Sequence, residues 1–194
     1  MDLLAQTFQI RSLRNDDSLQ DLTSMLHRAF SPMGRDGIGC TCFDQSEATT
    51  RRRAALGECF VAVMDHRIVG TLTLQRADRR SDCRWYRRSN VTSLHQFAVD
   101  PAYQGEGVGK GLLAHAMDWA FENRFDELAL DTPHPAQHLI RFYEAQGFRK
   151  VESVQFSGRP YQSCILSHSL VSAPEGLPAA SYQASQQPLF GLLV

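Results

Sequence analysis

Four glycines at alternate positions form the stretch of this sequence best suited to bind a ligand: Gly105, Gly107, Gly109 and Gly111. From Val108 onward apolar residues recur at helical spacing, so the glycines lie where a helix begins. The first N–H groups of a helix have no partner within the helix, and glycine has no Cβ to hold a ligand away from the backbone. Such a turn is suited to an anion, above all a phosphate.

The spacing of this loop decides which phosphate ligand it suits. Each charge-assisted hydrogen bond to phosphate contributes about 1.5–3 kcal/mol, so a few of them would anchor a pyrophosphate. A P-loop requires glycine where Gln104 stands, and Ser or Thr after Lys110. The Rossmann pattern G-x-G-x-x-G requires glycine in place of Lys110. A nucleotide-binding regulatory domain is therefore disfavoured.

Two motifs give the chain a resemblance to a known family. Gln104-x-x-Gly107-x-Gly109 follows a strand that ends at Val99-Asp100-Pro101, and an F-Y-x-x-x-G-F segment occupies residues 142–148. With these motifs the sequence resembles the GNAT superfamily of acyl-CoA-dependent N-acyltransferases, roughly over residues 8–170 and most strongly over 94–151. The resemblance implies an α/β (α+β) fold with a mixed, mostly antiparallel central sheet of six or seven strands, flanked by helices, with a splayed central strand pair.

The same resemblance implies acetyl-CoA as the co-substrate. Backbone groups of the central strand would bond the pantetheine and polarise the thioester carbonyl, and the glycine loop would hold the diphosphate. The cofactor-binding residues implied in this way are Phe97, Ala98, Val99, Gln104, Gly105, Glu106, Gly107, Val108, Gly109, Lys110, Gly111 and Tyr143.

Tyr143 is the candidate general acid. It stands at the position of the catalytic tyrosine in the family's F-Y-x-x-x-G-F motif, where it would protonate the departing CoA sulfur. The alternative is a buried tyrosine whose hydroxyl bonds to backbone.

His95 is the candidate general base. A free amine is mostly protonated at neutral pH, so a group must accept a proton before attack, and histidine titrates near that pH. His95 occupies the strand position where many family members carry glutamate. Strand alternation places His95 on the same face as Phe97 and Val99, and the sequence does not decide which face meets the acceptor. The alternative is a packed histidine satisfied by a hydrogen bond.

One segment departs from the family pattern. Many members carry asparagine shortly after the neighbouring strand, and here Thr132-Pro133-His134 takes that place. His134 and His138 are four residues apart, but no third ligand stands nearby, so no metal site is expected.

Composition narrows the partners and the compartment. The chain has 194 residues, a net charge of −1 and a pI near 6.6, so the totals favour neither nucleic acid nor a membrane surface as partner. Five cysteines without C-x-x-C spacing predict a reducing compartment and no disulfide framework. The N-terminus lacks a basic region followed by an apolar run, so we expect a cytoplasmic, unanchored protein.

The order of elements predicts one domain over residues 1–170 and a tail over 171–194. The expected strands are residues 8–13, 59–64, 68–74, 94–99, 127–132, 148–156 and 161–168, and the expected helices are a first one closed by residues 31–34, then 44–57, one from 108, and 135–146. The tail is rich in Pro, Ser, Ala and Gln and ends in LFGLLV, which leaves a homodimer open.

Three further segments have two interpretations each. Residues 35–43 are glycine-rich and are either a flap beside the substrate or a plain connector. Residues 76–90 are either a recognition loop or an exposed connector whose aromatics Trp85 and Tyr86 pack on the sheet. The cluster Arg51-Arg52-Arg53 is either a solvated helix face or a contact to the cofactor phosphates.

The sequence as a whole predicts an N-acetyltransferase. It would transfer the acetyl group of acetyl-CoA to a primary amine of a small molecule or protein by direct attack in a ternary complex. The alternative is a non-catalytic acyl-CoA-binding sensor or regulatory domain. Nothing in residues 35–43 or 76–90 separates an amino acid, a polyamine, an aminoglycoside and a peptide as the acceptor.

Overall fold

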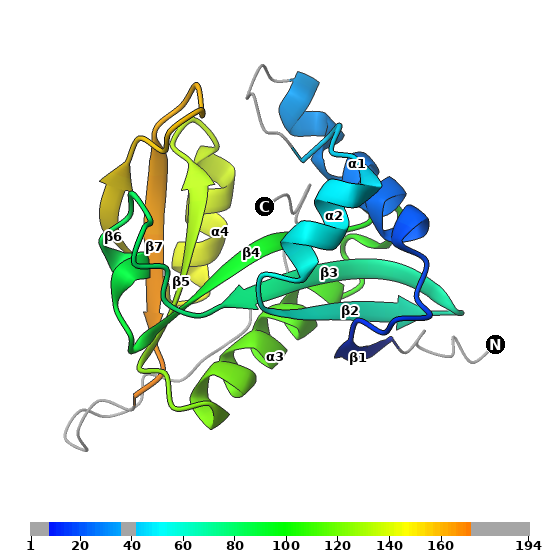
Figure 1. Cartoon of the computed structure of the whole chain (residues 1–194), viewed down its shortest axis with the longest axis horizontal. Coiled ribbons are helices and arrows are strands. Elements are labelled where there is room, and N and C mark those ends of the chain that lie inside the picture. The colour runs from blue at the N-terminus through cyan, green and yellow to red at the C-terminus, as the bar shows by residue number, and fades with distance from the viewer. Residues whose placement is uncertain (1–7, 36–41, 172–194) are drawn as a thin grey trace.

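The computed structural model describes residues 8–35 and 42–171, so most of the expected flap and tail lie outside the described residues. Figure 1 shows the elements in their arrangement. In chain order they are β1 (Gln9–Ser12), α1 (Leu19–Arg35), α2 (Glu47–Ala54), β2 (Glu58–Met64), β3 (Arg67–Gln75), β4 (Val91–Val99), α3 (Val108–Glu122), β5 (Glu127–Pro133), α4 (Gln137–Ala145), β6 (Arg149–Val154) and β7 (Ser163–Ser169). Two short 3-10 turns cover Trp85–Arg87 and Pro101–Tyr103.

The strands form one mixed sheet, which confirms the expected fold class. Its seven strands have the order β1-β2-β3-β4-β5-β7-β6. Only β4 and β5 run parallel, and the other neighbouring pairs are antiparallel. Helix α3 is the crossover between these two parallel strands, as a parallel connection requires.

The parallel pair is short and then parts. Val91–Leu94 of β4 pair with Glu127–Leu130 of β5, and the last pair joins Leu94 to Leu130. Beyond that pair the two strands diverge, and β5 continues against β7 alone (Figure 1). The expected splayed central pair is therefore present.

A β-bulge in β4 lies directly beyond the last pair. Thr73 of β3 faces His95, whereas Thr71 faces Ala98, so one residue of β3 opposes two residues of β4. Gln96 has a φ of 51°, a left-handed backbone that is uncommon outside glycine. The bulge shifts the alternation of side chains along β4 by one position.

Helices cover both faces of the sheet. Figure 1 shows α1 and α2 on one side of strands β2–β4 and α3 on the other. Helix α3 lies so close to β3 that a Cβ on Gly70 would be 2.9 Å from Leu112 Cδ1 and 3.2 Å from the Ala98 carbonyl oxygen. Glycine at this position thus sets the distance between α3 and the central strands.

Two helices differ from their predicted bounds. Helix α1 continues through Pro32 to Arg35 instead of closing at residues 31–34. Met33, which is only 3% exposed, extends the buried face of Leu22, Met25 and Leu26 past the proline, and this packing offsets one missing N–H bond. Helix α2 begins after Ser46, whose hydroxyl accepts from the Thr49 N–H at 3.2 Å, and ends before the predicted stop.

Glu127 closes the paired end of the β4–β5 junction. It is 8% exposed and accepts hydrogen bonds from Ser167 Oγ at 2.6 Å and from Trp85 Nε1 at 3.2 Å. Arg88 and Arg149 form ion pairs with it at 3.3 and 3.4 Å. One buried carboxylate thus joins β5, β6, β7 and the loop before β4.

We therefore predict that Glu127→Gln destabilises the fold. The amide keeps the shape but loses the charge that two guanidinium groups face, which costs about 1–3 kcal/mol of unfolding free energy. Chemical denaturation measures this loss. The exposed Glu122→Gln at the end of α3 is the matched control and should unfold like the unmodified protein; equal effects of the two changes would contradict the assignment.

Candidate active site

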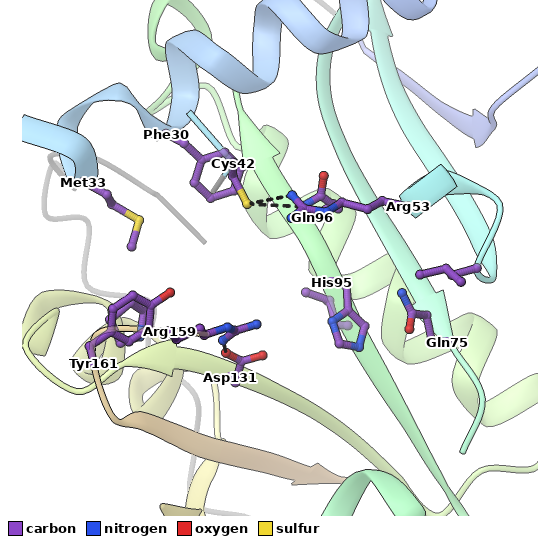
Figure 2. A pocket seen from close by; sticks show the side chains of 13 residues that line it. Phe30, Met33, Cys42, Arg53, Gln75, His95, Gln96, Asp131, Arg159 and Tyr161 are labelled. Atoms are coloured by element: carbon purple, nitrogen blue, oxygen red, sulfur yellow. Dashed lines mark hydrogen bonds and ion pairs between the residues drawn. The ribbon is translucent and has the colours of Figure 1, made fainter. Parts of the chain in front are cut away.

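The point where β4 and β5 part brings together polar side chains from distant parts of the chain. The pairing of β4 with β5 ends at Leu94 and Leu130, and His95 and Asp131 are the next residues of the two strands. Both line a cavity of about 260 Å³ that Figure 2 shows from close by. The cavity lies on the side of the sheet that α1 and α2 cover, and it is lined by Phe30, Met33, Cys42, Arg53, Leu56, Gln75, Leu94, His95, Gln96, Asp131, Pro133, Arg159 and Tyr161.

His95 is held at the floor of this cavity. Its Nε2 lies 2.8 Å from Ser93 Oγ, and its ring meets the edge of the Tyr86 ring at 5.5 Å between centroids. Burial lowers the pKa of His95 below its ordinary value; the nearby Arg159 and Arg53 lower it further, and Asp131 opposes them. The imidazole is therefore neutral near pH 7 and able to accept a proton.

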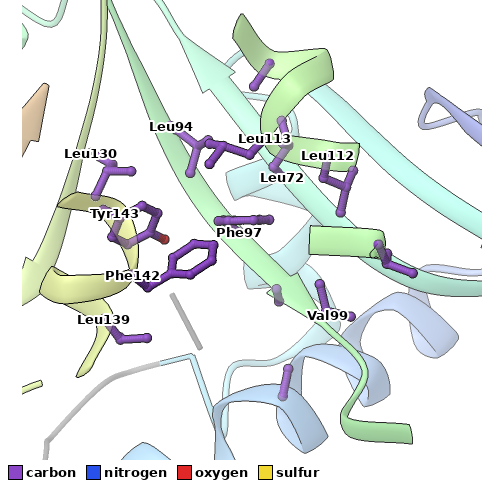
Figure 3. Close-up of a cluster of buried hydrophobic side chains, with 14 of the residues drawn as sticks. Leu72, Leu94, Phe97, Val99, Leu112, Leu113, Leu130, Leu139, Phe142 and Tyr143 are labelled. Atoms are coloured by element: carbon purple, nitrogen blue, oxygen red, sulfur yellow. The ribbon is translucent and has the colours of Figure 1, made fainter. Parts of the chain in front are cut away.

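The face that His95 shares with its neighbours differs from the prediction. Alternation placed His95 with Phe97, but the bulge at Gln96 puts His95 and Gln96 in the cavity, while Phe97 enters the large core with Leu94 (Figures 2 and 3). Neither glycine nor proline marks the bulge, so alternation alone could not predict it. The prediction of a shared face was wrong for this reason.

Asp131 forms a network that sequence reasoning missed. Its carboxylate accepts from Arg159 and from the hydroxyls of Tyr86 and Ser163, at 3.3 and 3.2 Å for the two hydroxyls. Tyr86 belongs to the segment 76–90 and is buried, so the interpretation as a connector with packed aromatics holds for it. The one available signal for Asp131 was a charged residue directly after the apolar run Leu128–Leu130 of a strand.

Arg53 enters the cavity from the opposite wall. Its Nη1 donates to Gln45 Oε1 and lies 3.4 Å from Cys42 Sγ. Gln45 in turn donates to the bulge residue Gln96 at 3.1 Å. Of the basic cluster on α2, Arg51 and Arg52 are exposed as a solvated face would be, but Arg53 faces the cavity, a placement that neither predicted interpretation included.

The glycine loop lies beyond the other end of β4. Gly105 and Gly107 have φ of 88° and 83°, a left-handed backbone that glycine adopts without strain, and a Cβ on either would meet nothing within 4 Å. Gly107 is the N-cap of α3. Gln104 Nε2 donates to the Val99 carbonyl at 3.3 Å and so ties the loop to the end of the strand. The loop is thus open at the start of α3, as an anion site requires.

Gly111 does not share this role. Its N–H donates to the Gly107 carbonyl at 2.9 Å, so its amide is satisfied within the helix. A Cβ on Gly111 would be 2.8 Å from Phe8 Cζ, which makes it a packing position. The amide of Gly111 is therefore already bonded within the helix, and the amides before it are the candidates for binding an anion.

Tyr143 lies on the face of the sheet opposite His95. The side chain is fully buried, and its hydroxyl points toward Phe97 of β4 (Figure 3). Among residues 8–35 and 42–171 the hydroxyl has no hydrogen-bond partner, so the alternative of a tyrosine bonded to backbone is not what the described residues show. Burial raises the pKa of Tyr143 well above its ordinary value, so the hydroxyl keeps its proton.

Thr132 is a second buried hydroxyl beside the parting strands. Its Oγ1 has no partner within the described part of the chain either, and it stands where the family pattern has asparagine. Alternation along β5 directs it away from the face of Asp131. Two buried hydroxyls without partners on one face mark a position for a polar ligand, because leaving them unmet costs about 1–3 kcal/mol each.

A cavity of about 440 Å³ lies between α3 and α4 on the face opposite the cavity beside His95. It extends from Lys110, close to the glycine loop, to Gly147 after α4.

His134 and His138 are exposed, and no cluster of three potential metal ligands occurs among the described residues. Within the same residues, no helix combines the length and apolar content that a bilayer crossing requires.

Solved structures share this arrangement of elements. The ribosomal-protein-S18-alanine N-acetyltransferase from Escherichia coli matches with a TM-score of 0.64 at 21% identity, over 89% of this chain and 100% of that chain. A Bacillus subtilis acetyltransferase solved in complex with CoA matches with a TM-score of 0.60 at 18% identity, over 85% and 100% of the two chains. At such identities the likeness shows the fold.

Sequence comparison goes further than fold. N-acetylaspartate synthetase of Xenopus tropicalis is 29% identical over 100 residues, which are 51% of this chain and 34% of that protein, so the match spans about a third of that relative. The model of the Acetyltransferase (GNAT) family matches residues 20–148, from α1 to the end of the F-Y-x-x-x-G-F motif. This match covers well over half of the chain and agrees with the sheet order and the loop before α3, so the chain belongs to the GNAT family of acetyltransferases.

Proposed function

We propose that this protein transfers the acetyl group of acetyl-CoA to a primary amine by direct attack in a ternary complex. The observation that carries the proposal is the pair of neutral groups at the parting of β4 and β5. His95 reaches the gap from one face and Tyr143 from the other (Figures 2 and 3). One can accept a proton and the other can donate one.

Acetyl-CoA would bind along the face of α3 and α4. The amides of residues 105–110 and the dipole of α3 suit its diphosphate, and the edge of β4 around residues 97–99 suits its pantetheine amides. Phe97, Ala98 and Val108 have buried side chains, so their part in binding is through the backbone. The similar Bacillus subtilis protein, whose structure contains CoA, supports CoA as the ligand.

His95 and Tyr143 would act on the two ends of the reaction. His95 accepts a proton from the ammonium group, and the resulting amine nitrogen forms a bond to the thioester carbon. As the carbon–sulfur bond breaks, Tyr143 donates its hydroxyl proton to the thiolate. The proton then released by the acylated nitrogen restores the tyrosine. Placing both reactants at one gap supplies up to roughly 7–11 kcal/mol in well-oriented systems.

The cellular compartment is also part of the proposal. Cys59, Cys83 and Cys164 are free thiols, which supports a reducing compartment such as the cytosol.

The relatives named above differ in their acceptors, since one is named for acetylaspartate and another for a ribosomal protein alanine. The acceptor must therefore be inferred from the cavity itself.

Tyr143→Phe provides the main test. Removing the acid should lower the release of free thiol from acetyl-CoA by about 10²-fold or more. Because the hydroxyl has no described partner, the variant should be as stable as the unmodified protein or slightly more so. A structural tyrosine would give the reverse pattern, a loss of stability with turnover intact. Acetyl-CoA binding without turnover in the unmodified protein, with every amine tried, would instead indicate a sensor.

Gly107→Ala tests the loop. Alanine at a φ of 83° is strained by roughly 1–2 kcal/mol and places a Cβ where the diphosphate would lie. Calorimetry should therefore show acetyl-CoA binding weakened at least about 10-fold. Gly158→Ala is the matched control, because Gly158 has a similar φ of 78° with open space around it, in the loop between β6 and β7. Equal losses in both variants would remove the loop from the binding site.

His95→Gln tests the base through pH. The reactive imidazole is the neutral form, its fraction rises with pH, and its pKa lies below the ordinary 6.5. The ratio of unmodified to variant rates cancels the titration of the amine substrate. This ratio should rise from acid pH, reach half its maximum below pH 6.5 and level off at about 10²-fold. The exposed His138→Gln should give a ratio of one throughout, and a flat ratio for His95→Gln would exclude it as the base.

A further inference from the structure

The cavity beside His95 has a charge pattern that selects its acceptor. Its described lining holds two guanidinium groups, those of Arg53 and Arg159, against the single carboxylate of Asp131. Because burial keeps His95 neutral, the lining has an excess of positive charge. A purely cationic amine would face this excess without a compensating group, whereas an amine that also carries an anion would not.

Arg53 and Asp131 lie on different walls of the cavity (Figure 2). Figure 2 shows Arg53 reaching in from the side of α2, and Asp131 with Arg159 from the side of β5, with His95 between them. Arg53 is fixed in direction by Gln45, and Asp131 by Arg159 and Ser163. The site therefore holds a negative group, Asp131, on one side of His95 and a positive group, Arg53, on the other.

Size limits the acceptor as well. A cavity of about 260 Å³ is at or below the lower end of the range for small-molecule sites. Phe30, Met33 and Leu56 supply apolar lining next to the charged groups. This combination suits a small molecule with a short side chain, and it leaves little room for an aminoglycoside.

We propose that the acceptor is a free α-amino acid or a similarly small amino carboxylate, with its ammonium group at Asp131 beside His95 and its carboxylate at Arg53. This inference rests on the proposed acetyl transfer and names the substrate class of that reaction. Arg53 is then the residue that determines specificity. A polyamine lacks the carboxylate, and the free amine of a peptide N-terminus has an amide in its place.

The test compares each amino acid with its own carboxamide. The twenty standard amino acids, their carboxamides and spermidine are assayed for thiol release from acetyl-CoA by the unmodified protein. We expect at least one amino acid to exceed its carboxamide in kcat/KM by roughly 10-fold to 100-fold, the worth of one charge-assisted contact. If carboxamides or spermidine react as well as the acids, the inference is overturned while acetyl transfer stands. If no amine releases thiol, the proposed function fails and this inference fails with it.

Two variants assign the contacts. Arg53→Gln should bring the ratio of acid to carboxamide close to one, and Arg53→Lys should restore part of it. Arg52→Gln, an exposed neighbour on the same helix, should leave the ratio unchanged. Asp131→Asn should lower kcat/KM for acid and carboxamide alike and keep their ratio. Because a ratio does not depend on the folded fraction, an unchanged ratio in Arg53→Gln would overturn the role of Arg53 even if that variant folds poorly.

Discussion

The separation of β4 from β5 after the Leu94–Leu130 pair is the constraint on which the rest of this structure depends. Backbone N–H and C=O groups need partners, and two strands that part leave groups on their facing edges that an extended ligand can meet. The cavity beside His95 lies at this separation, and a second cavity lies between α3 and α4 on the other face of the sheet. In the proposed function, acetyl-CoA on the face of α3 and α4 would present its thioester to an amine on the other face.

Specific contacts fix this separation. The cluster around Glu127 holds the paired end closed, since four donors from two strands and the loop before β4 converge on one carboxylate. Past the last pair, the bulge at Gln96 turns β4, as bulges bend and twist their strand. Gln45 fastens the bulge to the segment before α2, and Arg159 fastens Asp131 to the loop before β7. Specific hydrogen bonds and ion pairs therefore hold both the paired end of β4 and β5 and the end where they part.

The sequence predicted those parts of the site that one local segment encodes. The glycine loop before α3 and the place of Tyr143 follow from short motifs, and the mostly antiparallel sheet with its splayed strand pair follows from the family resemblance. Arg53, Asp131 and Arg159 could not be found this way, because three separate elements bring them together and none stands in a motif. The glycine run also misled at its end. Four identical residues at equal spacing serve different purposes, and only the fold shows that Gly111 packs against Phe8.

Burial shifts the pKa values of His95 and Tyr143, the proposed base and acid, through the same physical cause. Removing a titratable group from water favours its neutral form, which lowers the pKa of a histidine and raises that of a tyrosine. In the proposed mechanism the neutral form of His95 would accept a proton, and the neutral form of Tyr143 would donate one. For His95, the charges of Arg159 and Arg53 lower the pKa further, and that of Asp131 opposes them. In the proposed reaction the charges around the cavity beside His95 would select the amine, and the parting of β4 and β5 would bring both reactants to one gap.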